Sequence, residues 1–301
     1  MKNIVFKRLT AFLLVACVAF AFAGCGPKVE NASQEQPKQE EKKAEEPKAE
    51  APKEEAPKPE TKLDKIKKAG KIVVGTSADY APYEFHTIID GKDTIVGFDI
   101  KIAEEIAKDL GVKLEIQDLG FDGLLQALNA DKVDFVIAGM TPDEERKKSV
   151  DFTNIYYYAK QGVMVRAADK DKYKTIADLK GKKVGAQLTT IQEDIVKEQM
   201  KESKLVSLTK IPDLVMELKN KKVEAIVVEL PVANGYVKNN GDLVVADIKV
   251  EEDTGGSAVA AKKGNSELVE AMNKTLDRLI KDGSVDKFVT EANELNVVVK
   301  K

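Results

Sequence analysis

Short apolar runs with strand-like composition alternate with segments of helical periodicity along most of the chain. Runs rich in valine, isoleucine and alanine predict buried strands at residues 71–75, 113–117, 133–138, 162–166, 183–186, 225–228 and 257–261. Apolar residues spaced three and four apart predict helices at residues 99–110, 123–130, 190–201, 212–219, 231–239 and 266–281. Strands that alternate with helices indicate an α/β architecture with largely parallel sheets.

Two weaker patterns complete this picture. A turn at Asp90-Gly91 predicts a hairpin whose second strand covers residues 94–98, and a last helix is expected near residues 285–295. The part from residue 62 to residue 301 is long enough for two lobes of ordinary domain size.

The N-terminal residues have the pattern of an export signal. Three basic residues within positions 1–8 precede a nearly continuous apolar run over residues 9–23. That run is shorter than the roughly 20 residues of a membrane-spanning helix, and it ends in Ala23-Gly24-Cys25, which resembles a bacterial lipoprotein cleavage box. We therefore expect residues 1–24 to be a signal peptide and Cys25 to be lipidated. The alternatives are a box ending at Cys17 and an uncleaved anchor helix.

A segment of unusual composition follows at residues 25–61. It contains six prolines, seven lysines and ten glutamates and no aromatic residue, so it is predicted to be a disordered tether. The formal net charge of the whole chain is −3, which does not suggest nucleic-acid binding.

In parallel sheets, ligands bind beyond the carboxyl ends of the strands. Four predicted strand ends carry polar or charged residues: residues 76–80, residues 139–141 followed by Arg146, residues 187–190, and Glu229. Thr141 and Thr190 each stand three residues before a glutamate, so each is predicted to cap a helix, with Pro142 in the first turn of the former. Helix starts favour anions.

Arg146 lies just inside the first of these helix starts, where an extra cation is unfavourable, so we expect it to hold an anion. The alternative is an exposed arginine on the charged face 144–148. Glu229 ends a run that is apolar enough to be buried, and a buried carboxylate needs a cation beside it. That cation could belong to a ligand or to a nearby lysine.

Aromatic residues bracket the first hairpin. Tyr80, Phe85 and Phe98 could form the walls of a slot for a ligand or could be core residues, and Tyr80 favours the slot because it follows a polar strand end. His86 is the only histidine, and we expect it in a loop and not at a metal site. No metal site or cofactor is expected.

Several blocks of the sequence together resemble the polar amino-acid solute-binding proteins of ABC importers. These blocks are VGTSADYAPYEF, IVGFDIKIAEEIAKDLG, FDGLLQALNADKVDFVIAGMTPDEERKKSVDFT and LIKDGSVDKF, and they follow the order found in that family. The resemblance implies a two-lobed periplasmic-binding-protein fold of type II, with lobe 1 at residues 62–160 and 248–301 and lobe 2 at residues 161–247. It also implies two crossings between the lobes, near residues 158–162 and 246–252.

The resemblance further implies roles for individual residues. Arg146 is expected to hold the ligand's α-carboxylate, with help from Thr141 and from the helix start that contains Thr190 and Gln192. The Gly139 carbonyl and Glu229 are expected to bind the α-ammonium, while Tyr80 and Phe98 enclose the side chain. Three positions depart from the family: Glu229 is usually aspartate, Ser77 stands where many binders of basic amino acids and glutamine have aspartate, and Gln187 replaces residues that differ between subfamilies.

The expected function is therefore that of a lipid-anchored, extracytoplasmic receptor that delivers a polar L-amino acid to an ABC permease. Asp79 and Glu84, near the expected slot, favour arginine or another basic amino acid over glutamine. The alternatives are an enzyme of the same fold, similar to a dehydratase, a glutamine-type binder, a sensor domain and an adhesin.

Overall fold

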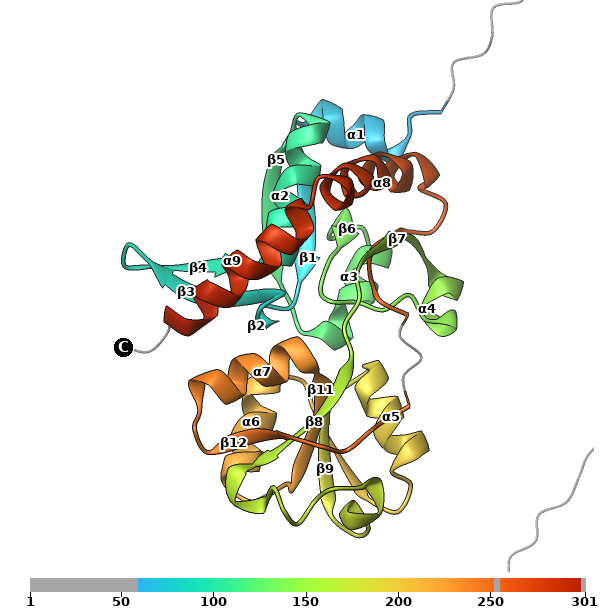
Figure 1. Ribbon diagram of the computed structural model, residues 1–301. Helices are drawn as coiled ribbons and strands as arrows, with labels where there is room; N and C mark the ends of the chain where they lie inside the picture. Colours follow the sequence, from blue (N-terminus) through green and yellow to red (C-terminus); the bar gives the residue numbers. More distant parts are fainter. Residues whose placement is uncertain (1–58, 252–254, 299–301) are drawn as a thin grey trace, which may run out of the picture. The chain divides into compact units, whose positions relative to one another are not determined.

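The computed structural model describes residues 59–251 and 255–298 (Figure 1). The expected signal peptide, Cys25 and the tether up to residue 58 lie outside the described residues. Within the described ranges, no helix is both long enough and apolar enough to cross a membrane.

The first large sheet has five strands in the order β5-β1-β6-β13-β7. Strand β1 is parallel to β5 and β6, whereas β13 is antiparallel to β6 and β7, so β13 runs against the other four. The strands are β1 (Lys71–Thr76), β5 (Lys113–Asp118), β6 (Phe135–Val136), β7 (Val150–Tyr157) and β13 (Ser257–Lys262).

Helices and a small hairpin sheet accompany this first sheet. The helices are α1 (Lys62–Ala69), α2 (Phe98–Leu110), α3 (Leu124–Asn129), α4 (Glu144–Ser149), α8 (Ser266–Lys281) and α9 (Ser284–Val298), with a 3₁₀ turn η1 (Phe121–Gly123). The hairpin sheet contains β2 (Asp79–Tyr80), β3 (Glu84–Ile89) and β4 (Lys92–Val96). We call these elements together the first lobe.

The second lobe contains a five-stranded sheet in the order β10-β9-β11-β8-β12, in which β8 is antiparallel to β11 and β12. Its strands are β8 (Gln161–Arg166), β9 (Lys183–Gln187), β10 (Lys204–Leu208), β11 (Ala225–Glu229) and β12 (Leu243–Ala246). Its helices are α5 (Ile191–Gln199), α6 (Ile211–Lys219) and α7 (Leu230–Asn239), with 3₁₀ turns η2 (Ala167–Asp169) and η3 (Ile176–Leu179).

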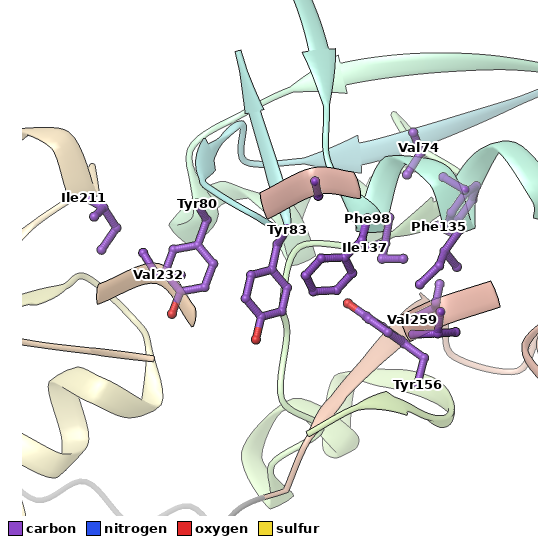
Figure 2. Packing of buried hydrophobic residues seen from close by; sticks show 14 of the residues in the cluster. Val74, Tyr80, Tyr83, Phe98, Phe135, Ile137, Tyr156, Ile211, Val232 and Val259 are labelled. Atoms are coloured by element: carbon purple, nitrogen blue, oxygen red, sulfur yellow. The ribbon is translucent and has the colours of Figure 1, made fainter. Parts of the chain in front are cut away.

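The chain passes between the lobes twice. It leaves the first sheet at the end of β7 and enters the second through β8, as Figure 1 shows, and it returns between β12 and β13. The largest cluster of buried apolar side chains contains residues of both lobes, among them Tyr80 and Val232, which lie beside each other in Figure 2. Burial of shared apolar surface therefore stabilises the arrangement of the two lobes seen here.

Position 97 requires glycine because the backbone there lies directly against the backbone of Tyr83. Gly97 precedes α2 with φ +133, and a Cβ atom placed there would lie 1.9 Å from the carbonyl oxygen of Tyr83. Only glycine fits a position with both this backbone angle and this contact. The end of the hairpin can thus lie directly against the segment that carries Tyr80 and Glu84.

The structure confirms most of the predicted elements, although predicted strand 133–138 is shortened to β6. The prediction that Thr141 caps a helix is wrong. The cap is Asp143, whose carboxylate accepts the backbone N–H of Arg146 at 2.7 Å, and Pro142 precedes the helix. Aspartate is a stronger cap than threonine, and a residue before proline is disfavoured in the helical conformation.

Candidate ligand-binding site

A small pocket lies between the two lobes, and we call it the interlobe pocket. The first lobe contributes Ser77, Asp79, Tyr80, Glu84, Phe121, Ala138, Gly139, Thr141 and Arg146, and the second contributes Gln187, Thr190, Ile191 and Gln192. Of the residues predicted to bind the ligand, all but Phe98 and Glu229 are in this lining.

Arg146 spans the pocket from one lobe to the other. Its guanidinium donates to the Thr141 carbonyl at 2.8 Å and, across the cleft, to the Thr189 carbonyl at 2.9 Å. Its Nε lies 3.2 Å from the Asp143 carboxylate. A guanidinium has five N–H donors, so two remain without a partner among the described residues and can bind an anion. Burial lowers the pKa of Arg146, with Asp143 acting in the opposite direction, but arginine stays charged near neutral pH.

The second lobe faces Arg146 with the start of helix α5. The Thr190 side chain accepts the backbone N–H of Glu193, as predicted, and its hydroxyl donates to the Gln187 carbonyl at 2.7 Å. The backbone N–H groups of Ile191 and Gln192 lie in the first turn, where a helix offers no carbonyl acceptor. This turn and Arg146 together form a strong site for a carboxylate.

The other predicted polar residues of the second lobe have partners within the protein. The Gln187 side chain donates to the Thr209 carbonyl at 3.0 Å, which identifies the partner that the sequence did not reveal. The Gln192 side chain donates to Gln161 at 2.9 Å. Both amides are thus held in place before any ligand enters.

Gly139 is fixed in position by a buried acid. Its backbone N–H donates to the Asp99 carboxylate at 2.8 Å, and Asp99 also accepts the Tyr156 hydroxyl at 2.8 Å. Gly139 has φ +53, and a Cβ atom there would lie 3.3 to 3.4 Å from the rings of Tyr80 and Tyr83. A side chain would therefore press on the aromatic wall of the pocket.

Phe98 is not in the pocket lining, which corrects its predicted place. Its ring is fully buried in the core, with its centroid 4.4 Å from that of Tyr83 and 5.0 Å from that of Tyr157, as part of the cluster in Figure 2. Phe121, which the sequence analysis did not select, lines the pocket and lies 5.4 Å below the Arg146 guanidinium. The signal that could have found it is its place directly after strand β5, at a carboxyl strand end.

Glu229 is also outside the pocket lining, contrary to its predicted place. It is buried behind Tyr80, whose hydroxyl accepts the Glu229 backbone N–H at 3.4 Å. Burial raises the pKa of Glu229 to about 7. Among the described residues no lysine or arginine forms an ion pair with it, and its Oε2 atom has no hydrogen-bond partner. Glu229 and Arg146 therefore do not line the same pocket.

A second acidic group does reach the pocket. Glu84 is fully buried in the lining, and neither of its carboxylate oxygens accepts a hydrogen bond from a described N–H or O–H group. Burial, followed by the neighbouring Asp99, raises the pKa of Glu84 well above its usual range, and burial raises the pKa of Asp99 to about 7. Two buried carboxyls that lie together favour sharing one proton. A cation at Glu84 would relieve this arrangement.

The pocket thus has a cationic end and an acidic end. Arg146 and the start of α5 offer donors for a carboxylate, while Glu84 and Asp79 offer acceptors for a positively charged group. Among the described residues no group of three histidine, cysteine or acidic side chains is arranged to hold a metal ion. This geometry fits a small molecule with charges of both signs.

Comparison with known proteins identifies the family of this chain. The family model for bacterial extracellular solute-binding proteins, family 3, matches residues 72–291. The arginine-binding extracellular protein ArtP of Bacillus subtilis (strain 168) is 37% identical over 287 residues, which cover 94% of this chain and 96% of ArtP.

Solved structures show the same relationship. The amino-acid ABC transporter substrate-binding protein AbpA of Streptococcus pneumoniae Canada MDR_19A, crystallised with L-arginine, has a TM-score of 0.77 and 41% identity, with 79% of this chain and all of AbpA covered. The ancestral amino-acid-binding protein AncCDT-1, described as a precursor of cyclohexadienyl dehydratase, has a TM-score of 0.70 and 36% identity, covering 77% and 99% of the two chains. The chain therefore belongs to the bacterial extracellular solute-binding proteins of family 3 and has the type II periplasmic-binding fold.

Proposed function

We propose that this solute-binding protein captures L-arginine in the interlobe pocket and delivers it to an ABC permease. The observation that carries the proposal is the presence of Glu84, a buried carboxyl that forms no ion pair among the described residues, in the same pocket as Arg146. Arginine carries a carboxylate at one end and a guanidinium at the other, so it fits both ends of the pocket. Two of the relatives described above are named for arginine or hold it.

In this proposal each end of the ligand has its own partners. Arg146, Thr141 and the first turn of α5 bind the α-carboxylate, and the Gly139 carbonyl accepts the α-ammonium. Tyr80 and Phe121 enclose the methylene chain. Glu84 and Asp79 accept the guanidinium, which explains how a basic side chain is bound although Ser77 replaces the aspartate of many relatives. Glu229 acts indirectly, because its strand neighbour Gln161 accepts the side chain of Gln192.

Arginine is expected to stabilise the protein more than any other of the twenty amino acids in a thermal-shift screen. A ligand that binds only the native state contributes about 2.7 kcal/mol at one hundred times its Kd, which is a rise in Tm of roughly 5–10 °C for a domain of this size. Glutamine or cystine giving the larger shift would overturn the choice of ligand. Arginine recovered unchanged from the same samples would support binding without turnover, since a dehydratase precursor is among the structural relatives.

We further propose that a lipid on Cys25 holds the protein at the outer face of the cell membrane, with residues 26–61 as the tether. Replacing Cys25 with alanine is expected to shift the protein from the membrane fraction to the medium, because the lipid is attached through this sulfur. Cell fractionation followed by immunoblotting measures the shift. The matched control is Cys17→Ala, which should leave the protein with the membrane. The reverse result, release by the change at Cys17 alone, would move the lipidation site there.

A further inference from the structure

Asp79 connects the two lobes in a way that ligand binding alone does not require. It lies on β2 in the first lobe, and its carboxylate accepts the backbone N–H of Ile211 in the second lobe at 3.2 Å. Ile211 is the first residue of helix α6, and Lys210 at the cap position makes no side-chain cap bond. A side chain of one lobe therefore caps a helix of the other.

This contact depends on the two lobes being together. The first N–H groups of a helix have no partner inside the helix, and a carboxylate is favoured there by the helix dipole. If the lobes separated, the Ile211 N–H and the Asp79 carboxylate would both lose this bond. Ile211 is itself buried in the cluster that contains Tyr80 and Val232, so the contact lies within a packed region (Figure 2).

Asp79 also separates two hollows. It lines the interlobe pocket on one side, and on the other it lines a groove between the hairpin and helices α6 and α7, formed with residues such as His86, Lys210 and Tyr236. Both hollows have walls from both lobes. Asp79 thus lies at the seam where the lobes meet, between the interlobe pocket and this groove.

The charges around Asp79 make the contact sensitive to pH. Burial raises the pKa of Asp79 to about 6, with Lys210 acting to lower it and Asp118 to raise it. Ser77 donates a long hydrogen bond of 3.5 Å to the carboxylate. The other titratable groups that face it are Tyr80, Glu84 and Tyr236, while His86 hydrogen-bonds to Asp118.

We propose that Asp79 is a latch that stabilises the closed arrangement of the lobes by capping helix α6 across the cleft. By holding the lobes together it slows ligand release, in addition to accepting the ligand's guanidinium. The inference rests on the proposed function only for the choice of arginine as the ligand.

The latch is tested by Asp79→Ala, with dissociation followed by stopped-flow tyrosine fluorescence. Loss of a helix cap costs about a fivefold change in equilibrium, so dissociation of the neutral analogue citrulline should accelerate about fivefold. Dissociation of arginine should accelerate at least as much, because Asp79 also accepts its guanidinium in the proposed site. Asp178→Ala is the matched control, because Asp178 forms a capping box with Thr175 inside the second lobe only. Acceleration for arginine alone, or for neither ligand, would overturn the proposal.

A ligand-free measurement separates this inference from the proposed function. Spin labels on Lys108→Cys and Lys201→Cys, both at exposed positions of opposite lobes, report the interlobe distance in a chain with Cys17 and Cys25 replaced by serine. The closed fraction should fall in Asp79→Ala whether or not arginine is the ligand. An unchanged distance distribution would contradict the latch.

Asp79→Asn provides a variant that keeps the fold if the alanine variant does not. Its amide oxygen can still accept the Ile211 N–H, but the group cannot titrate. Burial in the closed arrangement raises the pKa of Asp79 to about 6, so this arrangement binds the proton more tightly than an open one in which the carboxylate is exposed. The closed fraction of the unsubstituted protein should therefore rise as the pH drops through about 6, and this rise should be smaller in Asp79→Asn. Identical pH profiles would rule out the latch as the origin of the effect.

Discussion

Replacing Arg146 with alanine is expected to weaken arginine binding more than a hundredfold. The guanidinium is largely buried in the interlobe pocket, and the carboxylate that binds to it would be left without its counter-charge. Removing one partner of a buried ion pair costs roughly 3 to 5 kcal/mol, which corresponds to a factor of more than one hundred in Kd. Isothermal titration calorimetry measures the change directly.

Two further variants identify the cause of that loss. Arg146→Lys keeps the charge but not the two parallel N–H donors, so an intermediate loss is expected. Lys148→Ala removes an exposed cation from the same helix, where it pairs only with Glu145, and should leave Kd unchanged. Thermal unfolding of each variant shows whether loss of the bonds to the Thr141 and Thr189 carbonyls changes the fold. An alanine variant that binds arginine as tightly as before would refute the assignment.

Replacing Glu84 with glutamine is expected to remove the preference for arginine over citrulline. Citrulline has nearly the same shape as arginine but a neutral end group, so it does not use the charge of Glu84. Loss of the buried carboxylate should cost arginine about 3 kcal/mol, more than a hundredfold in Kd, and change citrulline binding little. Competition calorimetry with both ligands gives the ratio.

The same residue predicts how binding depends on pH. In the free protein, burial and Asp99 raise the pKa of Glu84, so the carboxyl tends to hold a proton. A guanidinium beside it favours the ionised form and lowers this pKa, so binding releases the proton. Affinity for arginine should therefore rise with pH up to the pKa that Glu84 has in the free protein, and it should fall as the solution becomes more acidic.

The controls for Glu84 use another acid of the first lobe. Glu104 is exposed on α2 and pairs with Lys101, so Glu104→Gln should change neither the selectivity nor the pH profile. The pH dependence of arginine affinity should be weaker in Glu84→Gln than in the unsubstituted protein. A variant with full selectivity for arginine would show that Glu84 does not contact the guanidinium.

Most of the strands that the sequence revealed have a neighbouring strand on both sides. Predicted central strands such as β1, β9 and β11 are continuous apolar runs, and helix α8 was predicted with the bounds that the structure shows. The strands that were missed, β2, β7, β10 and β12, all lie at sheet edges. An edge strand has a neighbour on one side only and is partly solvated, so its composition gives a weaker signal.

Among the site residues, too, some were predicted correctly from the sequence and others were not. The sequence identified Arg146 through its misfit with the helix dipole and Thr190 through its capping pattern, both of which are local properties. It predicted correctly that Phe98 and Glu229 lie at the ends of elements. It also predicted that their side chains line the pocket, whereas both are buried outside the lining. Whether a buried side chain faces a pocket or the core depends on which residues lie opposite it, and those come from distant parts of the chain.

The sequence by itself determined the α/β architecture and the carboxyl strand ends that carry the polar groups, and it predicted that Arg146 binds an anion. Each follows from interactions within a few residues, such as hydrophobic periodicity, capping and the helix dipole. Only the tertiary structure decided that Glu84 joins Arg146 in one pocket, that Glu229 lies behind Tyr80, and that Asp79 caps a helix of the other lobe. These contacts join residues separated by 62 to 149 positions, and only the packing of the two lobes brings them together.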